Sequence, residues 1–117
     1  MLRSSRRLSF AIPLLAAACL ALPASADCAK PGRAPVMPQG ATASDEEMRE
    51  GHTELQKYVN ELQTYQACLE KMAKDVPPDA KPEVKAALQA RADDAISAAE
   101  QIANVYSAQL RAYKARQ

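Results

Sequence analysis

The sequence predicts an all-α fold, an antiparallel two-helix hairpin with coiled-coil-like packing and an extended N-terminal arm tethered by a disulfide. Two apolar stripes with helical spacing are separated by Pro77-Pro78, and Cys28 and Cys68 lie outside the N-terminal apolar run. A short connection between two long helices makes them antiparallel neighbours. The expected organisation is a signal peptide at 1–26, an arm at 27–43, helices at 44–76 and 82–116, and a loop at 77–81.

The first 26 residues have the pattern of a secretory signal peptide. Arg3, Arg6 and Arg7 precede an apolar run at 8–22, and Ala24-Ser25-Ala26 forms a small-residue cleavage site. The run is shorter than the roughly 20 residues that a membrane span needs, and no second run follows. We therefore expect cleavage after Ala26, a periplasmic or secreted location, and no membrane span in the mature chain.

A lipid anchor at Cys19 is the alternative for this segment. Cys19 follows three alanines, as a lipidated cysteine follows small residues, but Ala16 stands where the usual motif has leucine. The sequence favours a cysteine that is discarded with the signal peptide.

The arm at 27–43 is expected to be extended. It contains Pro31, Pro35 and Pro38 together with Gly32 and Gly40, and it lacks periodic apolar positions. Such a composition is typical of polyproline-like chain.

A disulfide between Cys28 and Cys68 is the default pairing in an oxidising compartment. Free thiols or a bond between chains are the alternatives. Because Cys68 lies far along the first helix, the bond within one chain requires the arm to double back along that helix.

The first helix has a clear start and end. Ser44 and Glu47 form a capping box at its N-terminus, and Pro77 ends it near Asp75 or Val76. A seam of positions alternately three and four residues apart runs between these limits. It consists of Met48, Gly51, Leu55, Tyr58, Leu62, Tyr65, Leu69, Met72 and Val76.

The second helix carries a broad, alanine-rich stripe. We expect Asp79 to cap it and Pro82 to lie in its first turn. Folding the hairpin about residue 79 places His52 opposite Tyr106. The same register puts the acidic start of the first helix beside the basic end of the second. The residues concerned are Glu46, Glu47, Glu50 and Glu54, and Arg111, Lys114 and Arg116.

Short motifs give the chain a resemblance to known proteins. Cys28, Pro31, Pro35, Pro38 and Gly40 precede the capped helix, and Tyr65, Cys68 and Leu69 follow in it. This pattern resembles a set of small, uncharacterised exported proteins of Gram-negative bacteria. The resemblance implies a periplasmic helical hairpin with a cysteine pair, and it implies no activity.

The composition argues against an enzyme. His52 is the only histidine, and no base is evident near Ser44, Ser97 or Ser107. Without the signal peptide the chain has twelve basic and fourteen acidic residues, a balance that does not favour nucleic acid as a partner. No cofactor is expected.

One metal hypothesis arises from Met37, Met48 and His52. The returning arm would bring Met37 to the level of Met48, one helical turn before His52, and thioether and imidazole groups suit copper. The alternative is that both methionines belong to the core and that His52 is a flanking polar residue.

A Leu/Tyr seam could also bind a partner. A small domain with two helices buries too little surface to be stable without a partner or a covalent link. We therefore expect a homo-oligomer or an unknown protein partner, and a non-enzymatic binding or structural role. Weak chaperone-like binding of apolar segments is a further alternative. The seam residues considered are Leu55, Tyr58, Leu62, Tyr65, Leu69, Tyr106 and Tyr113.

Overall fold

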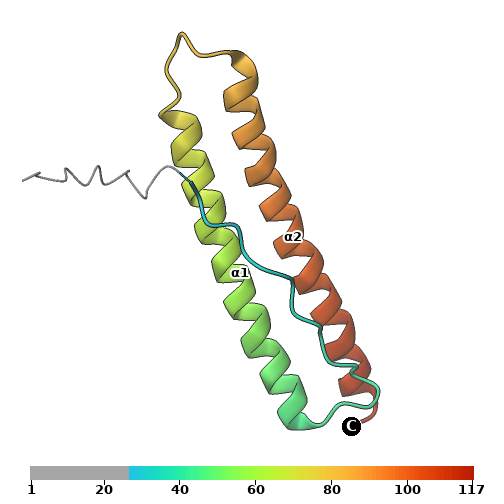
Figure 1. Cartoon of the computed structure of the whole chain (residues 1–117). Helices are drawn as coiled ribbons and strands as arrows, with labels where there is room; N and C mark the ends of the chain where they lie inside the picture. The colour runs from blue at the N-terminus through green and yellow to red at the C-terminus, as the bar shows by residue number, and fades with distance from the viewer. Residues whose placement is uncertain (1–26) are drawn as a thin grey trace, which may run out of the picture.

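Two long helices form an antiparallel hairpin in the computed structural model, which describes residues 27–117 (Figure 1). Helix α1 spans Asp45–Lys74 and helix α2 spans Pro82–Ala115. The described residues contain no β-strand. The predicted all-α hairpin is confirmed, whereas the predicted signal peptide and Cys19 lie outside the described residues.

Helix α1 begins with the predicted capping box. The Glu47 amide donates to the Ser44 hydroxyl over 3.1 Å, and the Ser44 amide donates to the Glu47 carboxylate over 2.6 Å. The hydrogen bond from the Ser44 amide, and to a lesser extent the Ser44 hydroxyl, lowers the pKa of the Glu47 carboxylate below its ordinary value of 4.5. At pH values above the ordinary pKa, the ionised Glu47 carboxylate therefore stabilises the folded state. This stabilisation is lost as the pH falls through the lowered pKa.

The substitution Ser44→Ala is expected to destabilise the protein by about 1 kcal/mol, because it leaves an amide of the first turn without its partner. For a domain of this size, that loss lowers the melting temperature by about 4–8 °C. Thermal unfolding followed by circular dichroism measures it. Ser97→Ala is the matched control, because Ser97 is exposed within α2 and its replacement by alanine should cause no loss.

The turn between the helices differs in detail from the prediction. Helix α1 ends at Lys74 with Asp75 as its C-cap, two residues earlier than Val76, and α2 ends at Ala115 with Arg116 as its C-cap. The expected cap at Asp79 is wrong, since Lys81 is the N-cap and makes no side-chain capping bond. Pro82 at the start of α2 explains this, because proline favours the first helical position and holds the preceding residue extended.

The helices pack along the predicted seam. Leu55, Leu62 and Leu69 are buried, and Leu69 is only 2% exposed. Ala92 and Ala95 are the buried residues of the loop-proximal half of α2, where small side chains allow the helices to approach closely. Burial of this face is the main source of helix stability, since isolated helices are marginal in water.

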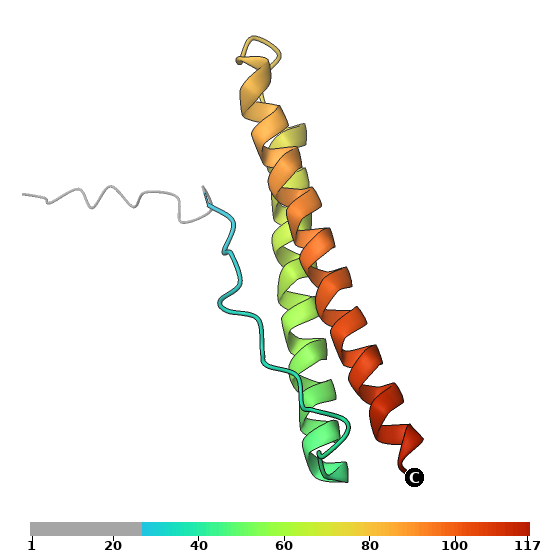
Figure 2. The same ribbon diagram turned by 90° about the vertical axis from the view of Figure 1, so that its right-hand side faces the viewer.

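The arm, residues 27–43, covers one side of the hairpin (Figures 1 and 2). It starts at the Cys28–Cys68 disulfide, whose Cα atoms are 5.7 Å apart, and runs back to the end of the hairpin where α1 begins and α2 ends. The disulfide and the doubling back are thus confirmed. The arm does not stay on the flank of α1 as expected, because it crosses to contact α2 as well.

Two glycines allow the arm to lie directly on the helices. A Cβ atom on Gly40 would lie 1.8 Å from the Gln109 carbonyl oxygen of α2, and one on Gly51 would lie 2.5 Å from Cδ of Pro38. The Gly40 amide also donates to the Gln109 side chain over 2.9 Å. Neither glycine has a positive φ, so close approach explains both residues.

The predicted ion pairs between the helices do not form. Lys71–Asp75, on the exposed surface of α1, is the one ion pair within residues 27–117. Arg116 instead donates to the Ala43 carbonyl oxygen, and its guanidinium lies 5.1 Å from the centre of the Tyr113 ring. Long exposed charged side chains lose entropy on pairing, so the expected pairs offered little free energy.

In residues 27–117, neither helix is both long enough and apolar enough to cross a lipid bilayer.

Candidate functional site

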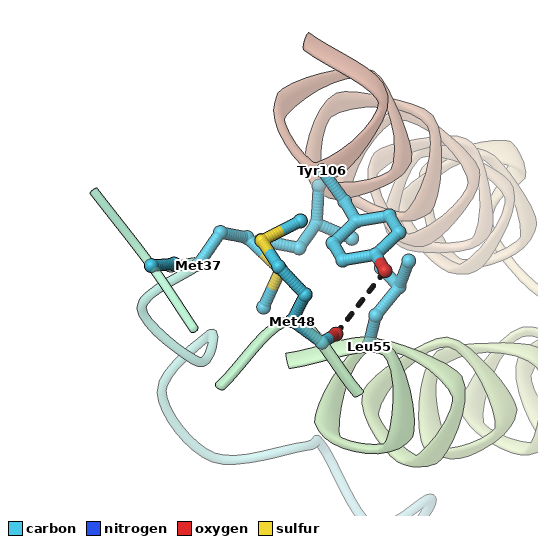
Figure 3. Packing of buried hydrophobic residues seen from close by; sticks show 6 residues of the cluster. Met37, Met48, Leu55 and Tyr106 are labelled. Carbon is cyan, nitrogen blue, oxygen red and sulfur yellow. Dashed lines mark hydrogen bonds between the residues drawn. The ribbon is translucent and has the colours of Figure 1, made fainter. Parts of the chain in front are cut away.

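A small core joins the arm to both helices near the end of the hairpin opposite the loop (Figure 3). Met37 of the arm and Met48 of α1 point toward each other and are 8% and 4% exposed. Leu55 and Tyr106 belong to the same cluster and lie beside Met48. The complete buried cluster is Met37, Ala43, Met48, Leu55, Ile102 and Tyr106.

Tyr106 fixes the register of the hairpin at this level. Its hydroxyl donates to the Met48 carbonyl oxygen over 3.2 Å (Figure 3). Its ring lies 5.5 Å from the His52 ring, measured between centroids, with the planes inclined by 33°. The predicted pairing of His52 with Tyr106 is confirmed.

The proposed copper ligands are therefore only partly assembled. The structure brings Met37 and Met48 together inside an apolar cluster, whereas His52 is exposed and lines a surface cavity that does not include Met37. Within residues 27–117, no three His, Cys, Asp or Glu side chains are grouped for metal binding. The copper hypothesis for these residues stays a prediction.

The cavity beside His52 lies on the side of the hairpin that the arm leaves free. Its volume is about 530 Å³ and no residue of the arm lines it. At its edge the Tyr113 hydroxyl donates to the Asp45 carboxylate. The lining residues are Asp45, Met48, Arg49, His52, Thr53, Tyr106, Leu110 and Tyr113.

A line of apolar residues continues from this cavity. Leu110 lines the cavity, and Ala103 and Ile96 precede it on α2 at intervals of seven residues, which places all three on one face. On α1, Val59 follows His52 at the same interval and packs against the core. We call Val59, Ile96, Ala103 and Leu110 the open face.

The seam itself is mostly interior. Leu55, Leu62, Leu69 and Tyr106 are buried, and Tyr58, Tyr65 and Tyr113 are half-buried. These residues therefore hold the hairpin together. The broad stripe predicted for the second helix includes Ile96, Ala103 and Leu110, but sequence reasoning did not separate them from the residues that face the first helix. Their interval of seven residues was the available signal.

A second group that the sequence analysis missed surrounds the disulfide. Sγ of Cys28 lies 3.3 Å from Sδ of Met72, so three sulfur atoms meet where the arm begins. A surface cavity of about 450 Å³ adjoins them. Its lining includes Cys28, Met72, Lys30 and Arg91.

Comparison of the chain with protein-family models, with curated proteins and with solved structures gave no match.

Proposed function

We propose that the protein is an exported, non-enzymatic binding or structural accessory that acts by self-association through its open face. The main support is that the arm covers only one side of the hairpin and leaves the other side without a covering segment (Figure 2). On the other side, Ile96 is 37% exposed and Leu110 is half-buried. A second copy would remove these side chains from water.

The shape of the open face supports pairing between helices. Ala103 lies between Ile96 and Leu110 along α2, so a large side chain of a partner helix can pack above the small one. Two hairpins joined in this way form a four-helix bundle, a common arrangement for helices with one uncovered apolar stripe. The thin core of a single hairpin adds a thermodynamic reason for association.

Other features support an exported and non-catalytic role. The disulfide is compatible with an oxidising compartment. The cavity beside His52 is lined by one imidazole, one carboxylate, one guanidinium and one hydroxyl together with two phenolic and two apolar side chains, a set that suits contact with a partner better than nucleophilic catalysis.

A charge on the open face tests the proposal. Ile96→Glu is expected to convert a self-associated protein to a monomer in sedimentation experiments at micromolar concentration, because pairing would bury the carboxylate without a partner. Ser97→Glu is the matched control, since the neighbouring exposed residue receives the same charge away from the open face.

Two outcomes would contradict self-association through this face. One is a wild-type protein that remains monomeric at all concentrations, and the other is an equal loss of association in both variants. A wild-type monomer that nevertheless slows aggregation of an unfolded protein would point instead to transient binding of apolar segments.

A further inference from the structure

Three sulfur atoms from two parts of the chain converge beside the loop-proximal half of α1. Cys68 and Met72 are four residues apart on α1 and so share a face of the helix, and the arm brings Cys28 to them. Sγ of Cys28 lies 3.3 Å from Sδ of Met72. With Cys28 and Cys68 oxidised, this is a contact between sulfurs in which no proton is shared.

The surroundings of these sulfurs admit small reagents from solvent. Cys28, Cys68 and Met72 are all half-buried, and the adjoining cavity of about 450 Å³ reaches Cys28 and Met72. Lys30, Arg91 and Asp27 line the same cavity, so its lining carries two cations and one carboxylate, and none of the three forms an ion pair in the part of the chain that the structure describes. Nearby cations favour thiolate over thiol.

We propose that the reduced protein binds one Cu(I) ion through the thiolates of Cys28 and Cys68 and the thioether of Met72. A small dithiol reductant supplies two electrons and two protons, so that the Cys28–Cys68 bond breaks, both cysteines become thiols and the dithiol becomes a disulfide. Binding of Cu(I) then releases the two thiol protons to solvent as two copper–thiolate bonds form.

The ligand set favours Cu(I) over other metals. Thiolate and thioether are the soft ligands that Cu(I) selects, whereas structural zinc sites use four thiolate, imidazole or carboxylate ligands and no thioether. One Cu(I) with two thiolates carries a net negative charge, which Lys30 and Arg91 oppose. This site is separate from Met37, Met48 and His52, and it does not depend on self-association.

Titration of Cu(I) against a coloured Cu(I) chelator tests the site, using protein reduced by a dithiol and then freed of reductant without oxygen. We expect one Cu(I) per reduced chain and none at this site with the disulfide intact. Met72→Leu should weaken binding by at least about tenfold, the lower end of the roughly 10–100-fold that loss of even an outer-sphere partner costs. Met48→Leu is the matched control, because it removes a thioether from the same helix at a distant level.

Two further measurements distinguish a ligand from a structural effect of Met72. X-ray absorption should count three sulfur neighbours of copper in the wild type and two in Met72→Leu. Cu(I) should also restore the protease resistance of residues 29–36 in the reduced protein, since the ion would rejoin the arm to α1. Circular dichroism of oxidised Met72→Leu checks that the variant folds.

Several results would overturn the proposal. The first is that the reduced protein binds Cu(I) no better than the oxidised protein. The second is that the wild type and Met72→Leu have equal Cu(I) affinities and equal numbers of sulfur neighbours. The third is that Met48→Leu loses copper and Met72→Leu does not. The last result would assign the metal to the methionine pair of the core.

Discussion

Breaking the Cys28–Cys68 disulfide, by reduction or by Cys68→Ser, is expected to destabilise the protein by about 4 kcal/mol. The two cysteines are 40 residues apart in sequence, and closing a loop of that length restricts the unfolded chain by this amount on chain-entropy grounds. Small domains have net stabilities of about 5–15 kcal/mol, so the loss is a large fraction of the total. Thermal unfolding with and without reductant measures it.

Loss of the disulfide should release only part of the arm. Residues 29–36 have no buried side chain, whereas Met37, Gly40 and Ala43 are buried against the helices. We therefore expect trypsin to cut after Arg33 in the reduced protein but not in the oxidised protein. The helical circular dichroism signal should persist below the lowered melting temperature.

A melting temperature that reductant leaves unchanged would contradict this expectation. So would resistance of the bond after Arg33 in fully reduced protein. Mass spectrometry of the tryptic fragments, with alkylation to count free thiols, records both the cut and the state of the cysteines in one sample.

Gly40→Ala is expected to cause the second large loss of stability, about 3 kcal/mol. The new Cβ would lie 1.8 Å from the Gln109 carbonyl oxygen and 2.8 Å from the Tyr113 amide nitrogen, both backbone atoms of α2. A helix backbone cannot move aside as a flexible side chain can. Overpacking of this kind typically costs about 1–3 kcal/mol, and the very short contact places Gly40→Ala at the upper limit.

Gly32→Ala is the matched control for Gly40→Ala, because a Cβ on Gly32 would meet no atom within 4 Å. It should alter stability by less than about 0.5 kcal/mol. Chemical denaturation of the two variants gives the comparison. Equal stabilities would mean that the arm does not lie on α2 at Gly40.

The local features of the fold were predictable because short-range chemistry determines them. The capping box at Ser44, the end of α1 before Pro77 and the periodic seam all depend on neighbours within a few residues. The wrong cap at Asp79 arose because the preference of Pro82 for the first helical position outweighs the capping preference of an aspartate.

Contacts between distant segments were harder to predict. Gly51 is the one seam position without a side chain. The structure explains it by the close contact of Pro38 in the arm, which leaves no room for a Cβ atom. The close approach of Gly40 to Gln109 depends on the path of the arm across the groove, which composition does not specify.

For the candidate sites, too, some contacts were predictable from the sequence and others were not. Met37 and Met48 meet because arm length and helix register bring them to one level, and both quantities follow from the sequence. Met72 was assigned to the seam, and its contact with Cys28 becomes visible only when the disulfide places the start of the arm. The interval of four residues between Cys68 and Met72 was the available signal.

The position of the disulfide in the chain also determines the order in which the structure can be completed. Both cysteines precede α2 in the sequence, so the covalent loop can close before residues 82–115 have packed against α1. The contact of Gly40 with Gln109 must wait for α2. Because residues 27–117 contain only these two cysteines, a chain freed of the expected signal peptide has a single possible internal bridge.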